Sequence, residues 1–167
     1  MIGFETERKL VIKKPDVELL RELPDFSVSH IIQTYLLSDK GVTHRVRSRE
    51  REGVTVYTEC IKRRLSAATC TEDEREITAE EYAQLLLRRD PRSATIEKTR
   101  ITFGYSDRIF EVDIYPGWER SCIMEVELPS EDTPVDFPPF ITVIREVTGD
   151  RRYSNAGMAL AFPDELI

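Results

Sequence analysis

The sequence feature that most constrains the fold is an alternation of charged and apolar side chains over short segments. In one segment, Glu125 and Glu127 alternate with Met124, Val126 and Leu128. Successive side chains of a β-strand point to opposite faces of its sheet. This segment is therefore predicted to be a strand with one acidic face and one apolar face. The apolar face needs a covering layer, which we expect helices to supply.

The same period of two recurs along the chain and predicts eight strands. They span residues 4–13, 31–37, 42–49, 54–62, 72–78, 94–105, 108–115 and 121–128. Three helices are expected at residues 15–22, 79–88 and 140–147, and the tail from residue 151 is expected to be mostly irregular. The pattern favours an α+β, mainly β fold. We predict an eight-stranded closed antiparallel β-barrel with a few helices packed outside, as one domain over residues 1–167.

The parity of the strands places charges of like sign together on one face. This face holds nine acids (Glu5, Glu7, Glu72, Glu74, Glu76, Glu111, Asp113, Glu125, Glu127) and six bases (Lys9, Arg45, Arg47, Lys62, Lys98, Arg100). A solvent-exposed face of a half-buried sheet would also be polar. Threonine, serine or glutamine would serve such a face equally well, whereas these positions are almost all paired carboxylates or paired cations. The pattern therefore favours a closed barrel with the charged face inward.

Charges inside a barrel need partners, because an unpaired buried charge is costly. Arginine and lysine side chains match phosphate oxygens, and clusters of carboxylates bind hard divalent cations such as Mg²⁺ or Mn²⁺. A site that combines the two suits phosphoryl transfer, in which catalysis depends on positioning and charge stabilisation. No glycine-rich phosphate loop of the Walker type is present in the sequence.

The composition argues against several other classes of protein. The 31 acidic and 24 basic residues give a net charge of −7, so we expect no nucleic-acid or membrane partner. No apolar run approaches the roughly 20 residues of a membrane span. The N-terminus lacks a signal-peptide pattern, and the three cysteines are expected to be reduced, so the protein is predicted to be cytoplasmic.

The order of the charged pairs matches a known pattern. Its motifs here are Glu5-x-Glu7-x-Lys9, Gln33-x-Tyr35-Leu36, Arg45-x-Arg47, Lys62, Lys98-x-Arg100, Glu111-x-Asp113, Glu125-x-Glu127 and Tyr153-Ser154-Asn155. Over essentially the whole chain, they resemble the CYTH domain, or triphosphate tunnel metalloenzyme, family. The resemblance implies an eight-stranded antiparallel tunnel, a divalent metal and a triphosphate-bearing substrate.

The resemblance also implies roles for individual residues. The metal would be held by Glu5, Glu7, Glu125, Glu127 and Asp113. The phosphates would be bound by Lys9, Arg45, Arg47, Lys62, Lys98 and Arg100, and the acidic set would be completed by Glu72, Glu74 and Glu111. The residues expected to be catalytic are Glu5, Glu7, Lys9 and Glu127, acting with a metal-activated water.

Two positions depart from the family pattern. Cys70 stands where the family often has an arginine, and the loop at residues 63–69 lacks the usual glycine. Some members use a basic residue of the C-terminal helix, for which Arg145, Arg151 and Arg152 are candidates.

The expected activity is hydrolysis of the terminal phosphate of inorganic tripolyphosphate. Three alternatives stay open at this point: a class IV-type adenylate cyclase, a thiamine or nucleoside triphosphatase, and a polyphosphate-binding module without activity. A homodimer is also expected, because the family often dimerises.

Overall fold

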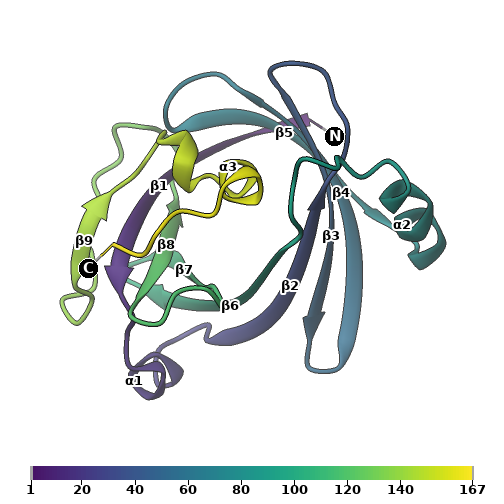
Figure 1. Cartoon of the computed structure of the whole chain (residues 1–167). Helices are drawn as coiled ribbons and strands as arrows, with labels where there is room; N and C mark the ends of the chain where they lie inside the picture. Colours follow the sequence, from purple (N-terminus) through teal and green to yellow (C-terminus); the bar gives the residue numbers. More distant parts are fainter. Residues whose placement is uncertain (1, 167) are drawn as a thin grey trace.

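Strand β1 closes the sheet in the computed structural model, which describes residues 2–166. The barrel strands are β1 (Ile2–Lys13), β2 (Ser27–Tyr35), β3 (Val42–Arg51), β4 (Val54–Arg64), β5 (Thr69–Ile77), β6 (Ile96–Tyr105), β7 (Arg108–Ile114) and β8 (Ser121–Glu127). They follow the order β5-β4-β3-β2-β6-β7-β8-β1, and β1 pairs again with β5. Figure 1 shows the resulting ring of strands. The predicted eight-stranded antiparallel barrel is therefore confirmed.

Short helices are added to this barrel. They are α1 (Val17–Arg21), α2 (Ala79–Leu86), the 3₁₀ helix η1 (Arg151–Tyr153) and α3 (Asn155–Leu160). Thr78 is the N-cap of α2, because its hydroxyl accepts from the Glu81 amide and the Glu81 carboxylate accepts from the Thr78 amide. In Figure 1, α2 lies outside the ring and α3 lies within its opening.

The helix predicted at residues 140–147 is wrong. The segment instead forms the short strand β9 (Val143–Glu146), which pairs with the C-terminal part of β1, residues 10–12, as a ninth strand of the same sheet. Its sequence from Ile141 to Ile144 consists of β-branched residues, which suit a strand better than a helix. An ion pair between Arg8 and Glu146, 2.6 Å long, fastens the added strand to β1.

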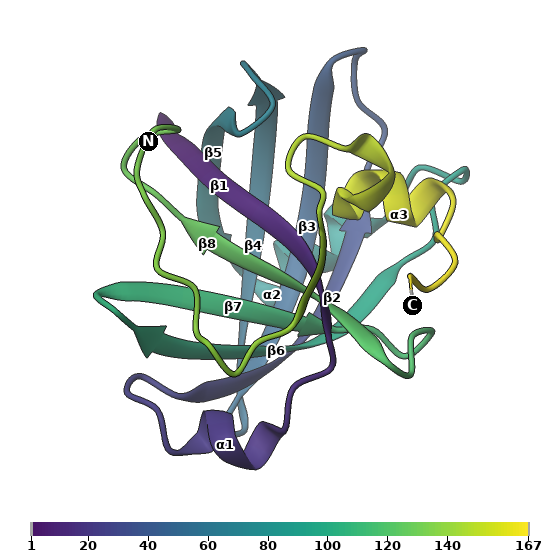
Figure 2. The ribbon, with the colours of Figure 1, turned by 90° about the vertical axis from the view of Figure 1, so that its left-hand side faces the viewer.

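The outer apolar face of β6, β7 and β8 is covered mainly by irregular chain, and not by several helices as expected. Phe110, Val112 and Met124 are fully buried in this layer. They pack with Leu20 of α1 and with side chains of the proline-rich segment at residues 129–142, such as Phe137. Figure 2 shows α1 at the bottom of the barrel and the long loop that runs across its side.

The tail from residue 151 is more ordered than predicted, because it fills one end of the barrel interior. Tyr153 and Met158 are buried against Val11, Tyr115 and other inward-facing residues. The Ser154 hydroxyl caps α3 by accepting from the Gly157 amide, and the Tyr115 hydroxyl donates to the Asn155 side chain at 2.8 Å. The C-terminal segment is thus an apolar plug at one end of a charged interior.

Among the described residues, no helix combines the length and apolar character that a membrane crossing requires.

Gly157 tests how tightly the C-terminal plug is packed. A Cβ at this position would lie 1.8 Å from the Arg151 carbonyl oxygen. We expect Gly157→Ala to lower the free energy of unfolding by about 2 kcal/mol, the typical cost of overpacking. Urea unfolding measures this change. The matched control is Gly3→Ala, where the nearest atom is 4.0 Å away. Equal stability of the two variants would contradict the tight packing of the plug.

Candidate functional site

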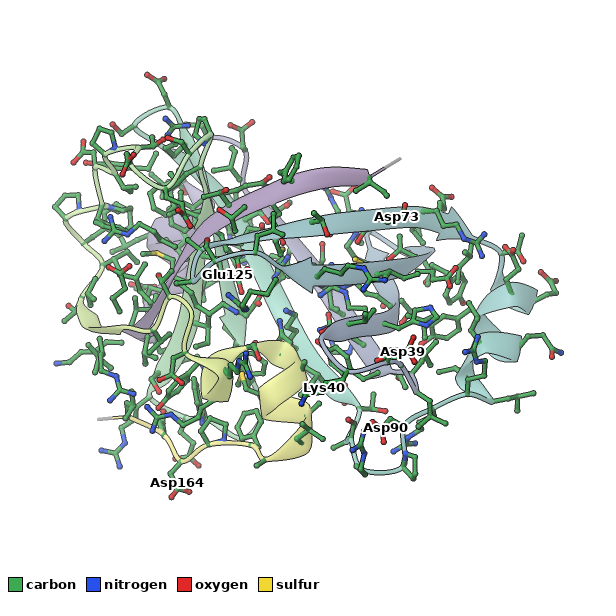
Figure 3. All side chains as sticks on the ribbon, turned by 90° about the horizontal axis from the view of Figure 1, so that it is seen from above. Asp39, Lys40, Asp73, Asp90, Glu125 and Asp164 are labelled. Atoms are coloured by element: carbon green, nitrogen blue, oxygen red, sulfur yellow. The ribbon has the colours of Figure 1, made fainter. Side chains whose placement is uncertain are left out.

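The barrel encloses a cavity of about 690 Å³ whose walls are charged. Its acids are Glu5, Glu7, Glu72, Glu74, Glu111, Glu125, Glu127 and Asp150, and its bases are Lys9, Arg45, Arg47, Lys62, Arg64, Arg100 and Arg151. Figure 3 shows Glu125 among the strands in the middle of the molecule, whereas Asp164 lies at its edge. Most of the predicted charged face therefore points into a cavity and not toward bulk solvent, whereas Glu76 is exposed and does not line the cavity.

The register of β1 and β8 brings the first carboxylates together. Glu7 lies opposite Glu127, and Lys9 lies opposite Glu125. The Lys9 ammonium is 3.3 Å from the Glu125 carboxylate and 3.8 Å from that of Glu7. A wall with four carboxylates, including Glu5, therefore carries one lysine.

The bases of β3 and β4 face acids of β5 and β1. The Lys62 ammonium donates to the Glu5 carboxylate at 2.5 Å, and the Arg45 guanidinium lies 3.9 Å from Glu72 and 3.8 Å from Glu74. The long Arg45 distances leave its N–H groups without a close carboxylate acceptor. Such an arginine can exchange its weak partners for phosphate oxygens at little cost.

Arg100 is held by acids from two neighbouring strands. Its guanidinium donates to Asp113 at 2.7 and 2.9 Å, contacts Glu111 at 2.6 Å, and lies 3.7 Å from Glu125. Asp113 also accepts from Lys98 at 2.7 Å, and their side chains are 1% and 0% exposed. Neither Lys98 nor Asp113 lines the cavity. This position disagrees with the predictions that Lys98 contacts phosphate and that Asp113 is a metal ligand. Both side chains lie behind Arg100. Strand parity predicts the face of the sheet on which a side chain lies but not how deeply it is buried, so this position could not be predicted from the sequence.

Arg47 differs from the other five predicted bases, since in the described chain it makes no ion pair with a carboxylate. Its guanidinium donates instead to the Gln33 side-chain oxygen, at 3.0 and 2.8 Å. Burial, together with the positive charges of Arg45 and Arg100, lowers the pKa of Arg47 to about 10. Even so, it stays cationic at neutral pH, and no carboxylate among the described residues forms an ion pair with it.

The carboxylates of the β1–β8 wall are unequally compensated. Although burial opposes their ionisation, Lys62 lowers the pKa of Glu5, and Lys9 and Arg100 hold that of Glu125 well below its usual value. Burial and the Glu125 charge raise the pKa of Glu7 to about 8. Burial and the charges of Glu5 and Glu72 also raise the pKa of Glu127.

This imbalance fits a divalent cation. Glu7 and Glu127 lie close to other carboxylates, and among the described residues Glu127 forms no ion pair. Oxygen ligands of this kind suit Mg²⁺ or Mn²⁺, and a bound cation would relieve the repulsion that raises both pKa values.

Among the described residues, the one group of three ligand atoms that already converge lies elsewhere in the cavity and fits a hard cation less well. The Cys60 sulfur and carboxylate oxygens of Glu72 and Glu74 lie within 4.8 Å of one another. However, burial raises the pKa of the Cys60 thiol to about 12, and the Arg45 guanidinium lies beside both carboxylates. A neutral thiol next to a fixed positive charge is a poor cation site.

The structure also locates the positions that the sequence pattern left open. Of the three C-terminal arginines, Arg151 lines the cavity, whereas Arg145 donates to the Tyr153 hydroxyl and Arg152 pairs with Asp150. Cys70 lines the cavity as well, with its thiol 3.4 Å from Glu5.

Several lining residues were not predicted from the sequence, and Arg64 and Tyr35 are two of them. Arg64 lies opposite Cys70 in the β4–β5 register, which places a guanidinium next to the position of the missing arginine. Tyr35 lines the cavity from β2. Its place in the Gln33-x-Tyr35 pattern, with the same parity as Gln33, was the signal that could have identified it.

Comparison with known proteins agrees with this geometry. The chain is 32% identical over 160 residues to the inorganic triphosphatase of Acetivibrio thermocellus, which covers 94% of each protein. The chain belongs to the triphosphate tunnel, or CYTH, family. The divalent-metal requirement of this family agrees with the carboxylate wall.

Two further relatives extend the comparison. A 70-residue stretch is 39% identical to the inorganic triphosphatase of Nitrosomonas europaea and covers 46% of that protein. The crystal structure of the inorganic triphosphatase NE1496 superposes with a TM-score of 0.58 at 28% identity, covering 96% of this chain and 97% of that one. No family model matches the chain.

The raised pKa of Glu7 predicts a pH dependence of stability. Between its ordinary value of 4.5 and about 8, the folded protein holds a proton on Glu7 that the unfolded chain releases. Metal-free wild type should therefore lose stability relative to Glu7→Gln as the pH rises from 5 to 8. Melting temperatures in the presence of a chelator measure this difference, with exposed Glu80→Gln as the control. A difference that is constant across this range would contradict the pKa assignment.

Proposed function

We propose that the protein is an inorganic triphosphatase that removes the terminal phosphate of tripolyphosphate. The observation that carries the proposal is the cavity inside the closed barrel, in which a wall of carboxylates faces a set of cations. This is the arrangement that a bound triphosphate and its metal need. The relative from Acetivibrio thermocellus, matched over 94% of its length, supports the same activity.

The carboxylates of the β1–β8 wall would hold the divalent cation, and Mg²⁺ or Mn²⁺ fits their oxygen ligands. The proposed ligands are Glu5, Glu7, Glu125 and Glu127. When bound, the cation lowers the pKa of a coordinated water and offsets phosphate charge. Lys9 lines the cavity beside this wall, 3.3 Å from Glu125, so it would contact a phosphate oxygen next to the metal ligands.

The cations of the cavity would bind the phosphates, and five of the six predicted bases line it: Lys9, Arg45, Arg47, Lys62 and Arg100. Their carboxylate partners, Glu72, Glu74 and Glu111 among them, hold the bases in place before substrate binds. Phosphate oxygens would then replace part of these contacts and offset charge that develops during transfer. We assign Lys98 and Asp113 a role different from the one predicted from the sequence. Asp113 holds the Arg100 guanidinium from behind, and Lys98 holds Asp113.

A phosphate-release assay across substrates tests the proposal most broadly. With Mg²⁺ or Mn²⁺, we expect tripolyphosphate to be cleaved faster than ATP, GTP or thiamine triphosphate. Products are identified by ³¹P NMR, where orthophosphate and pyrophosphate should appear together. Formation of cyclic AMP and pyrophosphate from ATP, without orthophosphate, would instead establish a cyclase. Binding of tripolyphosphate without any turnover would establish a polyphosphate-binding module.

The role of Glu7 has a direct mutational test. Glu7→Gln removes one metal-binding charge, so divalent-dependent turnover should fall by a factor on the order of 100 or more. The control is Arg8→Ala, because Arg8 lies on the same strand with opposite parity and pairs with Glu146 outside the barrel. Full activity of Glu7→Gln would refute the role of Glu7 in metal binding.

The cytoplasmic location and the homodimer stay predictions.

A further inference from the structure

Gln33 is a fully buried amide at the centre of a hydrogen-bonded chain that ends at the cavity on both sides. Its side-chain oxygen accepts two hydrogen bonds from Arg47, and its side-chain nitrogen donates to the Tyr35 hydroxyl at 2.7 Å. Gln33 is 0% exposed, whereas Arg47 and Tyr35 both line the cavity. The amide therefore lies behind two side chains that can contact a ligand.

The orientation of this amide follows from the chemistry of its neighbours. An arginine side chain has only donors, so the oxygen of Gln33 must face Arg47. The nitrogen then faces Tyr35, whose hydroxyl oxygen must act as the acceptor. The hydroxyl hydrogen of Tyr35 has no recorded acceptor among the described residues and is left to donate toward the cavity.

The neutrality of Gln33 has an electrostatic consequence. The other predicted bases that line the cavity are all near carboxylates, as Arg100 is to Asp113 and Lys62 is to Glu5. Arg47 is fixed in place by two hydrogen bonds to a neutral group, and among the described residues it forms no ion pair with a carboxylate, so its charge is more available to an anion than that of the other bases. A glutamate here would keep the geometry but cancel the charge.

We infer that Gln33 is a positioning residue, which presents the Arg47 guanidinium and the Tyr35 hydroxyl to the substrate as a pair of donors. The inference deepens the proposed function, on which it rests, because it assigns Tyr35 as a further substrate contact. The ligand class is a phosphate oxygen of an anionic chain, which accepts from both donors at once.

The variant Gln33→Glu separates this role from a purely structural one. A carboxylate of nearly the same size can accept from Arg47 with one oxygen and from the Tyr35 hydroxyl with the other. All contacts that support the fold are kept, yet the Tyr35 hydroxyl hydrogen turns away from the cavity and the charge of Arg47 is cancelled. A structural role predicts normal binding by this variant, and a positioning role predicts weak binding.

Isothermal titration with tripolyphosphate, without divalent cation, measures the effect independently of turnover. We expect Gln33→Glu to weaken binding about ten-fold to a hundred-fold, the loss typical of a charge-assisted hydrogen bond. Its melting temperature should equal that of wild type or exceed it. The matched control is Gln84→Glu, which makes the same substitution on the exposed surface of α2. Wild-type affinity in folded Gln33→Glu would overturn the inference.

A second variant, Tyr35→Phe, keeps the inference testable if Gln33→Glu fails to fold, and a double-mutant cycle with Arg47 adds an independent test. Tyr35→Phe removes one donor and should weaken binding by several-fold, whereas unchanged affinity would overturn the Tyr35 assignment. In an Arg47→Met background, Gln33→Glu should cost much less than in wild type, because its partner is gone. If wild type binds tripolyphosphate but cleaves no triphosphate, the proposed function fails while these titrations still decide the role of Gln33.

Discussion

The double pairing of β1 is the constraint on which the rest of the structure depends. Residues Ile2 to Thr6 pair with β5, and residues Glu7 to Lys13 pair with β8, so one strand joins the two edges of the sheet. Closure turns the face of Glu5, Glu7 and Lys9 into the wall of a cavity. A register slip of one residue would turn these side chains outward and bring Arg8 inside. Function and barrel closure therefore depend on the same hydrogen-bond register.

The interior that results is highly charged, yet its charges largely cancel. Charged side chains removed from water need partners, and the cavity supplies them across strands, as between Lys62 and Glu5 or Lys9 and Glu125. The side chains without an ion-pair partner are the ones expected to bind ligands. Glu127 lacks a positive partner among the described residues, and Arg47 lacks a negative one. An added cation and an added polyanion would complete both halves of the network.

Much of this arrangement could be predicted from the sequence, because strand parity is a simple rule and the side chains obey it. The alternation in the strands of Arg45 and Glu125 was sufficient to place both inside a barrel. Parity gives the side of the sheet but not the depth, so the burial of Lys98 and Asp113 behind Arg100 could not be read from it. That depth is set by how neighbouring strands tilt and how their side chains interlock.

The C-terminal region shows a different limit of sequence reasoning. The helix predicted at residues 140–147 is strand β9, since pairing with an already formed edge of β1 decides the conformation of a short β-branched segment. Helix α3 was missed because it has six residues and depends on tertiary contacts, such as the Tyr115–Asn155 hydrogen bond, more than on propensity. Both errors concern short segments whose structure is imposed by the barrel.

We propose that the metal and the triphosphate bind together inside the closed barrel. Crystals grown with Mn²⁺ and a non-hydrolysable triphosphate analogue test it directly, through the anomalous scattering of manganese. We expect an anomalous peak among the carboxylates of Glu5, Glu7, Glu125 and Glu127, with phosphate density against Arg45 and Arg47. Manganese or phosphate bound outside the barrel, with the cavity filled by water alone, would contradict it.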